Sequence, residues 1–336
     1  MRAVVLERFG IDGLELVERP EPECGPGQVL VGVRACSLNY RDLLLVEGRY
    51  NPRQPLPLVP LSDGAGEVLA VGAGVERVGV GDRVAGIFAQ RWLAGAFTPQ
   101  ARASTLGGPL DGMLAERVVL DAEGVVAVPE HLDFTEAACL PCAGVTAYSA
   151  LFVHGGLRAG QTVLLLGTGG VSLFALQLAV AAGARCIVTS SSPAKLERAR
   201  ALGADAGIDY RAEPEWQRRV LELTGGAGAD VVVEVGGGQT LPRSVAATRF
   251  DGRVALIGVL SGVRTELPLT AVLMKQVRIQ GVLVGSREAF EGLCRLVGLH
   301  RLRPLIDRRF GLDRVDEAFA QLRSGAHFGK VVVELG

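Results

Sequence analysis

The sequence predicts an α/β protein of two domains, one rich in β-strands and one built on a doubly wound parallel sheet. Short apolar or alternating runs, separated by Gly, Pro and Asp, fill about the first 130 residues and are typical of strands and turns. After Asp133, strands that are apolar throughout alternate with helical segments, as in a parallel sheet that is covered on both faces. A length of 336 residues also favours two domains over one.

The first domain is predicted to be mostly strand, with one short helix. Its apolar runs are brief, and the prolines at residues 52, 55, 57 and 60 mark a single loop. We expect strands at residues 2–7, 28–35, 66–71, 83–88 and 114–120, and a helix at residues 40–47.

The second domain begins with a helix-capping pair. Asp133 and Glu136 have the spacing of a capping box, which predicts a helix from there to about Val153. Ser192 and Pro193 supply an N-cap and a first-turn proline for a helix that ends at Gly203. A further helix is expected at residues 171–182, and strands are expected at residues 163–166, 185–189, 231–235, 253–257 and 277–284.

The residues after Ser286 form a tail that is too short to fold alone. They predict a helix to about Leu299, a strand near 305–306, a helix from Val315 and a last strand at 330–335. We expect this tail to return to the first domain. The predicted division is therefore 1–130 for the first domain, 131–285 for the second, and 286–336 for the segment that completes the first.

Composition and charge argue against several classes of protein. A net charge of -1 gives the chain no overall electrostatic reason to bind nucleic acid or an anionic membrane. The uncharged stretch 163–184 is long enough to cross a bilayer, but the glycines at 167–170 interrupt it, which indicates a strand, a turn and a buried helix. The 6 cysteines do not suggest a disulfide framework in a chain of this length, and we see no secretory signal, so we expect a cytoplasmic protein.

The strongest motif is a glycine turn between a buried strand and a helix. Gly167, Thr168, Gly169, Gly170 and Val171 follow the strand directly. Glycines there let a pyrophosphate approach the backbone, and the N-terminus of the helix favours its negative charge. Ser172 stands in the third glycine position of G-x-G-x-x-G, but the flanking strand and helix are those that the motif requires. The alternative is a tight turn that serves packing alone.

The end of the next strand indicates which dinucleotide binds. An acidic residue there would accept the ribose hydroxyls of NAD, but the chain has Ser190, Ser191, Ser192 and Lys195. Hydroxyls and an ammonium suit a phosphate, which favours NADP(H) over NAD(H). The alternative is that Ser192 only caps the next helix and Lys195 is a solvated surface residue.

Six further motifs are spread over nearly the whole chain. They are PLSDGAGEV at 60–68, VG at 71–72, GDRV at 81–84, GVTAY at 144–148, LGAD at 202–205 and GKVV at 329–332. With them the sequence resembles the medium-chain dehydrogenase/reductase superfamily, the group of alcohol dehydrogenases and quinone reductases. The resemblance implies a GroES-like first domain completed by the C-terminal segment, a Rossmann second domain, and a cofactor in the cleft between them.

The resemblance also bears on zinc. Asn39 stands where zinc alcohol dehydrogenases have a ligand Cys, and Ser62 replaces the ligand His, so only Cys142 fits a ligand position. Catalytic zinc needs three protein ligands. Residues 89–115 contain no Cys for a structural zinc lobe. We therefore expect no metal, and we interpret Cys139 and Cys142 as core or cleft thiols rather than a redox pair.

The same resemblance assigns the site residues. Asn39, Tyr50 and Asp63 fall at active-site positions, although Tyr50 could equally be a loop residue that covers the mouth of the cleft. The positions assigned to the cofactor, besides the glycine turn and the serine segment, are Tyr40, Thr146, Tyr210, Val235, Gly236, Ile257, Gly258, Val259, Val282, Val284 and Lys330. Ordinary packing is the alternative for each of them.

Together with the serine and lysine residues after the second strand, the resemblance implies an oxidoreductase that transfers hydride from NADPH to a quinone or an α,β-unsaturated carbonyl without zinc. Two alternatives stay open. One is an alcohol dehydrogenase-type enzyme that acts on simple C–O bonds, and the other is a non-catalytic NADPH-binding protein, a sensor or a nucleic-acid-binding protein. The apolar strand at 277–284 is expected at the edge of the Rossmann sheet, where it would pair with a second copy to form a homodimer.

Overall fold

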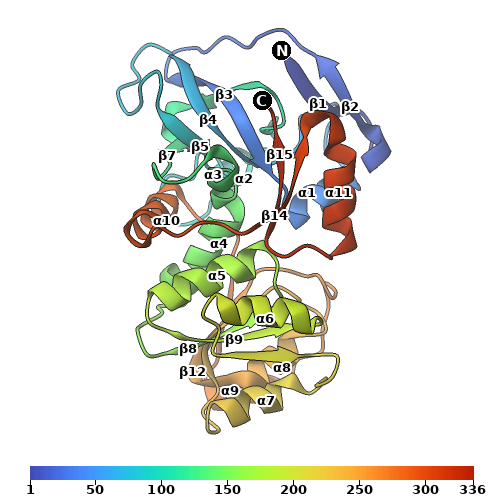
Figure 1. Cartoon of the computed structure of the whole chain (residues 1–336), viewed down its shortest axis with the longest axis vertical. Helices are drawn as coiled ribbons and strands as arrows, with labels where there is room; N and C mark the ends of the chain where they lie inside the picture. Colours follow the sequence, from blue (N-terminus) through green and yellow to red (C-terminus); the bar gives the residue numbers. More distant parts are fainter. The chain divides into compact units, whose positions relative to one another are not determined.

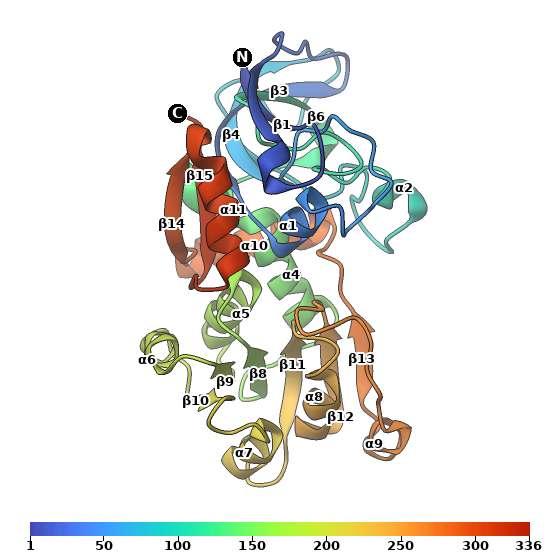
Figure 2. The ribbon, with the colours of Figure 1, turned by 90° about the vertical axis from the view of Figure 1, so that its right-hand side faces the viewer.

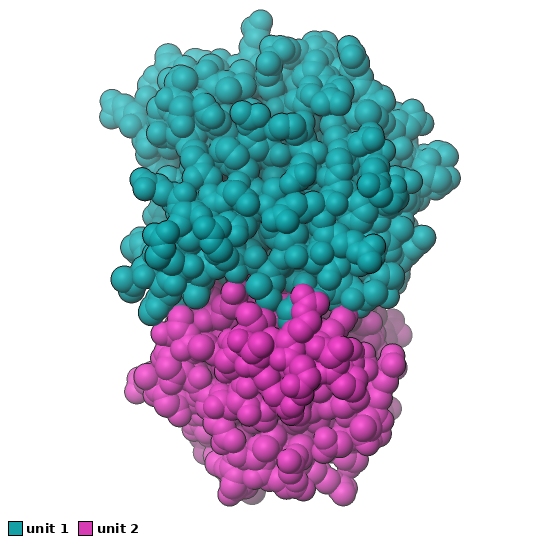
Figure 3. Space-filling view, in the orientation of Figure 1, with its two compact units in different colours: residues 1–145, 284–336 teal, residues 146–283 magenta.

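The computed structural model describes residues 1–336 as two compact units (Figure 3). The first unit comprises Met1–Val145 and Val284–Gly336, and the second comprises Thr146–Leu283. The C-terminal segment thus belongs to the first unit. The first boundary, expected at residue 130, lies at residue 145, because the helical turns between these positions pack on strands of the first unit.

A seven-stranded sheet is the framework of the first unit. Its strand order is β14-β15-β3-β4-β5-β7, and β6 also pairs with β3. The last strand of the chain, β15, runs antiparallel to β3 and parallel to β14, so it lies inside the sheet and not at its edge (Figure 1). The strands are β3 (Gln28–Ser37), β4 (Asp63–Val71), β5 (Arg83–Gly86), β6 (Arg117–Asp121), β7 (Val125–Ala127), β14 (Ile306–Gly311) and β15 (Lys330–Glu334), and a separate antiparallel pair is formed by β1 (Arg2–Leu6) and β2 (Leu14–Glu18).

The register of three neighbouring strands decides which side chains meet in the first unit. Ser37 ends β3 and lies opposite both Asp63, the first residue of β4, and Val332 of β15. The N–H of Leu38 donates to the carbonyl of Val331 at 3.0 Å. The start of β15, at Lys330, is therefore held beside the segment that follows β3.

The helices of the first unit are short, apart from the two in the C-terminal segment. The helix expected from 133 to 153 is a series of pieces with two π-helical turns, Leu140–Gly144 and Ser149–Val153, and Pro141 in the first of them cannot donate a backbone hydrogen bond. The α-helices outside the Rossmann sheet are α1 (Tyr40–Val46), α2 (Pro99–Arg102), α3 (Phe134–Ala137), α4 (Val145–Tyr148), α10 (Arg287–His300) and α11 (Val315–Ser324).

The second unit is a Rossmann domain with a six-stranded sheet. The strand order is β10-β9-β8-β11-β12-β13, and every neighbouring pair is parallel. Counted from β8, this is the order 3-2-1-4-5-6 of a dinucleotide-binding fold. Helices α5 and α6 lie on one face and α7 and α8 on the other (Figures 1 and 2). The bounds are β8 (Thr162–Leu166), α5 (Gly170–Ala181), β9 (Arg185–Ser190), α6 (Pro193–Ala201), β10 (Ala206–Asp209), α7 (Trp216–Leu223), β11 (Ala229–Glu234), α8 (Leu241–Ala247), β12 (Thr248–Leu256), α9 (Leu269–Lys275) and β13 (Arg278–Gly281).

The edge strand of this sheet is shorter than the sequence predicts. The expected strand at 277–284 is only the four residues of β13. The N–H of Val282 still donates to the carbonyl of Leu256 at 2.9 Å, but Val284 has a φ of +52° and turns the chain away from an extended path. Elements of the second unit that we did not predict are β10, α7, α8 and α9, each of eight residues or fewer.

Each unit has its own apolar core. In the first, Phe319 of α11 and Met113 are fully buried with side chains from the central strands. In the second, Trp216 and Val220 of α7 pack with Leu164 of β8 and its neighbours. None of the helices combines the length and the apolar character that a membrane crossing requires.

Candidate functional site

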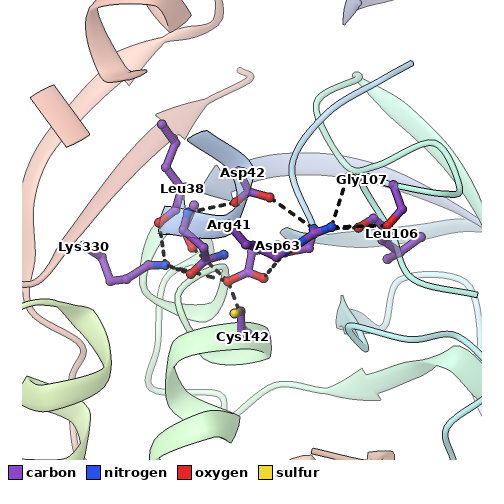
Figure 4. A network of polar contacts seen from close by, with 12 residues as sticks. Leu38, Arg41, Asp42, Asp63, Leu106, Gly107, Cys142 and Lys330 are labelled. Atoms are coloured by element: carbon purple, nitrogen blue, oxygen red, sulfur yellow. Dashed lines mark hydrogen bonds and ion pairs between the residues drawn. The ribbon is translucent and has the colours of Figure 1, made fainter. Parts of the chain in front are cut away.

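A buried polar cluster lies in the first unit where β3 ends and β4 and β15 begin. Its members are Ser37, Asn39, Asp63, Cys142 and Lys330. The strand register described above places Ser37 beside Asp63, and it places the start of β15 beside Asn39. Figure 4 shows Lys330 and Cys142 approaching Asp63 from different elements.

Asp63 is the centre of this cluster, and its carboxylate is completely buried. Oδ2 accepts the hydroxyl of Ser37 at 3.2 Å and the backbone N–H of Cys142 at 3.2 Å. Oδ1 accepts the hydroxyl of Ser62 at 3.0 Å, and the ammonium of Lys330 lies 3.9 Å from Oδ2. A buried carboxylate needs such partners to offset its desolvation. We therefore interpret Asp63 as the anchor of the cluster rather than a group that contacts substrate.

Lys330 is turned into the same cluster and is only 3% exposed. Its Nζ donates to the carbonyl of Leu38 at 2.7 Å and to Oδ1 of Asn39 at 2.5 Å (Figure 4). The sequence analysis assigned Lys330 to the cofactor. In the structure it contacts the loop after β3 and the carboxylate of Asp63.

Asn39 carries the one polar atom of the cluster that lacks a partner. The side chain is 8% exposed, and its Nδ2 forms no hydrogen bond. A buried donor without a partner costs about 1–3 kcal/mol, so buried donors are normally paired. The Nδ2 group of Asn39 can therefore donate a hydrogen bond to an oxygen atom of a ligand.

Arg41, two residues after Asn39, connects the start of α1 to the loop at residues 106–108. Its Nη1 donates to the carbonyl of Leu106 at 3.0 Å, and Nη2 donates to those of Gly107 and Gly108 at 3.3 and 3.2 Å. The guanidinium also lies over the ring of Tyr50, 4.9 Å from its centroid. Tyr50 is 44% exposed, so the structure brings it to Arg41 but not to the cluster around Asp63.

Asp42 is a buried carboxyl group beside Arg41. It accepts the backbone N–H of Asn39 at 2.8 Å, and its Oδ1 lies 3.3 Å from Nη1 of Arg41. Burial raises the pKa of Asp42 from 3.8 to about 6, and the lowering effect of the nearby guanidinium offsets only part of this. The hydrogen bond from Asn39 to Asp42 fixes the start of α1, and burying the carboxylate of Asp42 costs free energy.

The residues at this position do not fit catalytic zinc. Asn39 and Ser62 replace two ligands, and both oxygens of Asp63 already accept hydrogen bonds from neighbouring groups. Nowhere in the chain do three His, Cys, Asp or Glu side chains come together as a metal site would require. Burial also raises the pKa of the Cys142 thiol far above its usual range.

The glycine turn of the second unit fits a diphosphate. Gly167 has a φ of +74°, and Gly169 is the N-cap of α5 with no side chain capping the helix. A Cβ atom at either glycine would meet no atom within 4 Å, so open space lies in front of the N-terminus of the helix. Ser172, in the third glycine position, donates to the carbonyl of Leu166 at 2.6 Å and so ties α5 to β8.

The end of β9 holds the hydroxyl groups that the sequence analysis assigned to the cofactor. Ser192 accepts the N–H of Lys195 at 3.4 Å and so caps α6, and Ser190 accepts the N–H of Ser192 at 3.3 Å. Tyr210 donates its N–H to the carbonyl of Ser190 at 3.1 Å. The sequence analysis missed Asp209, which lies opposite Ser190 in the register of β10 and β9, because it did not predict β10.

A second residue that the sequence analysis missed is Glu234, which is completely buried at the end of β11. Its carboxylate accepts the N–H groups of Gly236 and Gly237 at 2.7 and 2.9 Å and the hydroxyl of Thr240 at 2.7 Å. Its backbone carbonyl accepts the N–H of Ile257 at 2.8 Å. Glu234 therefore braces the two loops that contain Val235, Gly236, Ile257, Gly258 and Val259. A lone acidic residue at the end of the apolar run VVVE was the available signal.

The other predicted cofactor positions are distributed over both units. Thr146, Val282 and Val284 are buried, whereas Tyr40 and Val259 are exposed. Thr146 and Val282 belong to the second unit, and Tyr40, Val284 and Lys330 belong to the first. The predicted cofactor residues are therefore divided between the two units.

Two families of known protein domains match the chain. The family described as "Alcohol dehydrogenase GroES-like domain" matches residues 25–130, and the family described as "Zinc-binding dehydrogenase" matches residues 170–298. A zinc-type alcohol dehydrogenase-like protein of Schizosaccharomyces pombe is 42% identical over 100% of this chain and 99% of its own. The chain belongs to the medium-chain dehydrogenase/reductase superfamily. It is an oxidoreductase of that superfamily.

Other members of the superfamily differ in what their names report. A quinone oxidoreductase-like protein 2 homolog of Nematostella vectensis is 31% identical over 92% of this chain and 82% of its own. A putative alcohol dehydrogenase from Sinorhizobium meliloti has a TM-score of 0.93 at 46% identity, covering 99% of this chain and 98% of that one. An NAD-dependent alcohol dehydrogenase has a TM-score of 0.91 at 36% identity over both whole chains. A crotonyl-CoA carboxylase/reductase in complex with NADP has 0.88 at 27% identity, over 100% of this chain and 95% of that one.

The raised pKa of Asp42 predicts a pH dependence of stability. The folded state binds the proton of Asp42 more tightly than the unfolded state does. The contribution of Asp42 to stability is therefore fully present below about pH 4 and is lost as the pH rises through about 6. The free energy of unfolding of the wild type, relative to Asp42→Asn, should fall by about 2 kcal/mol between pH 4 and pH 7. Denaturant titrations at four pH values would measure it, with the exposed Asp12→Asn as control. A constant difference across this range would contradict the prediction.

Proposed function

We propose that the enzyme transfers hydride from NADPH to a quinone or an α,β-unsaturated carbonyl without a zinc ion. The observation that supports this most directly is the unpartnered, buried Nδ2 of Asn39 in a cluster with no set of metal ligands. The amide is a hydrogen-bond donor for the acceptor's oxygen. Asn39 stands where zinc enzymes of the superfamily have a ligand Cys.

The glycine turn and the loops beyond it would hold the cofactor. Thr168 to Val171 present backbone N–H groups to a diphosphate, and open space lies beside Gly167 and Gly169. Glu234 fixes the loops at 235–237 and 257–259. When bound, the cofactor supplies the hydride, so the protein needs to orient the acceptor and polarise its oxygen.

The chemistry of the cluster favours a conjugated acceptor. Hydride addition to an isolated carbonyl concentrates negative charge on one oxygen, which zinc would stabilise by several kcal/mol. A neutral amide hydrogen bond contributes about 0.5–1.5 kcal/mol. Conjugation spreads the charge within the acceptor, so a weaker donor is enough. Relatives named for quinones and for crotonyl-CoA support the same class of acceptor.

A second candidate is an alcohol dehydrogenase that acts on simple C–O bonds. Several relatives that are named alcohol dehydrogenases favour it. The two candidates differ in the acceptor that they reduce and in their need for zinc, and one set of measurements separates them.

The proposed function predicts faster reduction of a conjugated aldehyde than of its saturated analogue. NADPH oxidation would be measured with both on one enzyme preparation, in which elemental analysis should find well under one zinc per chain. Asn39→Asp keeps the shape of the side chain and an oxygen for Lys330, but it replaces the free donor by an acceptor. This variant should lower kcat by roughly 10–100-fold, and because it buries a further carboxylate beside Asp63, kcat is compared at a temperature at which both enzymes are folded.

Two results would contradict the proposal. Faster reduction of the saturated aldehyde, or a stoichiometric zinc on which activity depends, would favour the alcohol dehydrogenase. An Asn39→Asp enzyme with wild-type kcat would show that the Nδ2 donor does not serve the reaction. Ser62→Ala, which removes one hydrogen bond to Asp63 but no donor to substrate, is the matched control.

We also propose that the enzyme prefers NADPH to NADH because Lys195 contacts the 2′-phosphate. One charge-assisted hydrogen bond is worth about 1.5–3 kcal/mol, so Lys195→Ala should weaken NADPH binding by about tenfold or more and leave NADH nearly unchanged. Fluorescence titration of the bound nicotinamide would measure both affinities. Equal losses for the two cofactors would sink this assignment. Asp209→Asn is the companion variant, because a loss of NADH affinity alone would show that this carboxylate binds the ribose of NAD.

A second copy of the chain is the partner that the exposed edge of the Rossmann sheet favours. β13 has only β12 as a neighbour, and the nearby helix α9 exposes Leu269, Leu273 and Met274 by 71–75%. We propose a homodimer in which two copies are related by a two-fold axis and each covers this apolar surface of the other. Leu273→Glu should convert the dimer to a monomer of 35.2 kDa in light scattering at micromolar concentration. Leu299→Glu, equally exposed on α10, should not, and a wild-type monomer would refute the proposal.

A further inference from the structure

Lys330 is unusual in this chain because the protein hardly uses lysine. Lys and Arg together number 35, and the sequence shows lysine only at 195, 275 and 330, so 35 − 3 = 32 are arginines. Lys330 is also the one of the three that is buried, at 3% exposure. An ammonium removed from water is costly unless it is paired, so its position requires an explanation.

The surroundings of Lys330 suit an ammonium and not a guanidinium. Nζ lies 2.7 Å from the carbonyl of Leu38, 2.5 Å from Oδ1 of Asn39 and 3.9 Å from Oδ2 of Asp63. These three oxygens surround a point charge with three donors, whereas an arginine would present a larger planar fork. The carboxylate of Asp63 supplies the compensating charge.

The contact with Lys330 determines how the amide of Asn39 is oriented. An ammonium has donors only, so it can face the oxygen of an amide and not the nitrogen. With Oδ1 held in this way, the Nδ2 group must point away from Lys330, and it is the atom without a partner. A positive charge next to Oδ1 also polarises the amide and strengthens the hydrogen bond that Nδ2 donates.

We infer that Lys330 is a positioning residue for the acceptor: its ammonium fixes and polarises the Asn39 amide so that Nδ2 donates to the acceptor's oxygen. This inference rests on the proposed function. It differs from the role that the superfamily resemblance suggests for Lys330, which is contact with the nicotinamide side of the cofactor. It also differs from a purely structural role in neutralising Asp63.

A double-mutant cycle separates these three roles. The wild type, Lys330→Met, Asn39→Ala and the double variant would be compared in kcat and KM for the conjugated acceptor, in NADPH affinity by fluorescence and in melting temperature. Lys330→Met should lower kcat by about tenfold or more and leave NADPH affinity within about threefold. In the Asn39→Ala background the same substitution should change kcat by less than about threefold, because the group that it orients is already absent.

The matched control is Lys275→Met. Nζ of Lys275 also donates to two backbone carbonyls, those of Val245 and Ala246 at 3.2 and 2.9 Å, but it lies in the second unit and contacts no predicted site residue. This variant should keep wild-type kcat and NADPH affinity. A loss of melting temperature shared with Lys330→Met would report the general cost of removing a lysine that binds carbonyls.

Each contrary outcome points to a different error. Losses in kcat that multiply across the two sites would overturn the coupling between Lys330 and Asn39. A loss confined to NADPH affinity would return Lys330 to the cofactor, and a loss confined to melting temperature would make it structural. A wild type that reduces no conjugated acceptor would instead contradict the proposed function, which the wild-type measurement decides before any variant is made.

Discussion

The first unit depends on one constraint, the need to satisfy the carboxylate of Asp63 in a site that water does not reach. Its partners come from β3, from the residue before β4, from the π-helical turn at Leu140–Gly144 and from the first residue of β15. A buried carboxylate needs hydrogen-bond donors around it, and here a cation offsets its charge as well. Strand β15 therefore has two roles: it pairs with β3 and β14 in the sheet, and it supplies the ammonium of Lys330 beside Asp63.

The second unit satisfies its buried carboxylate differently. Glu234 accepts hydrogen bonds from neutral groups, two backbone N–H groups and the hydroxyls of Thr240 and Ser244. Neutral donors are enough to hold a loop in place. The cluster around Asp63 includes an ammonium as well, and this ammonium contacts the only amide there with a donor to spare. The difference between the two carboxylates is what points to chemistry in the first unit.

The sequence is sufficient for features that are local or carried by motifs. The strand, turn and helix around Gly167 follow from glycines next to an apolar run, and Asn39 and Asp63 follow from motifs of the superfamily. The contact between Lys330 and Asn39 joins residues 291 positions apart, and it depends on the pairing of β15 with β3, which no local pattern contains. Asp209 was missed because four residues that include Gly207 give too little alternation to predict β10. The strand predicted at 277–284 was too long because apolar residues continue past the point where the backbone leaves the sheet.

The loss of zinc ligands and the presence of Lys330 have a common physical meaning. A metal ion stabilises an oxyanion by direct contact, and it needs ligands that this chain lacks at Asn39 and Ser62. In the proposed arrangement, the ammonium of Lys330 acts on the acceptor's oxygen only through the Asn39 amide, so it stabilises the negative charge there less than a metal ion would. Its own charge is also partly cancelled by the carboxylate of Asp63 at 3.9 Å. Under the proposed function, such a site would stabilise poorly an acceptor that gathers a full negative charge on one oxygen. It would be sufficient for an acceptor that delocalises the charge itself, so we propose that the weakness of the donor favours conjugated acceptors.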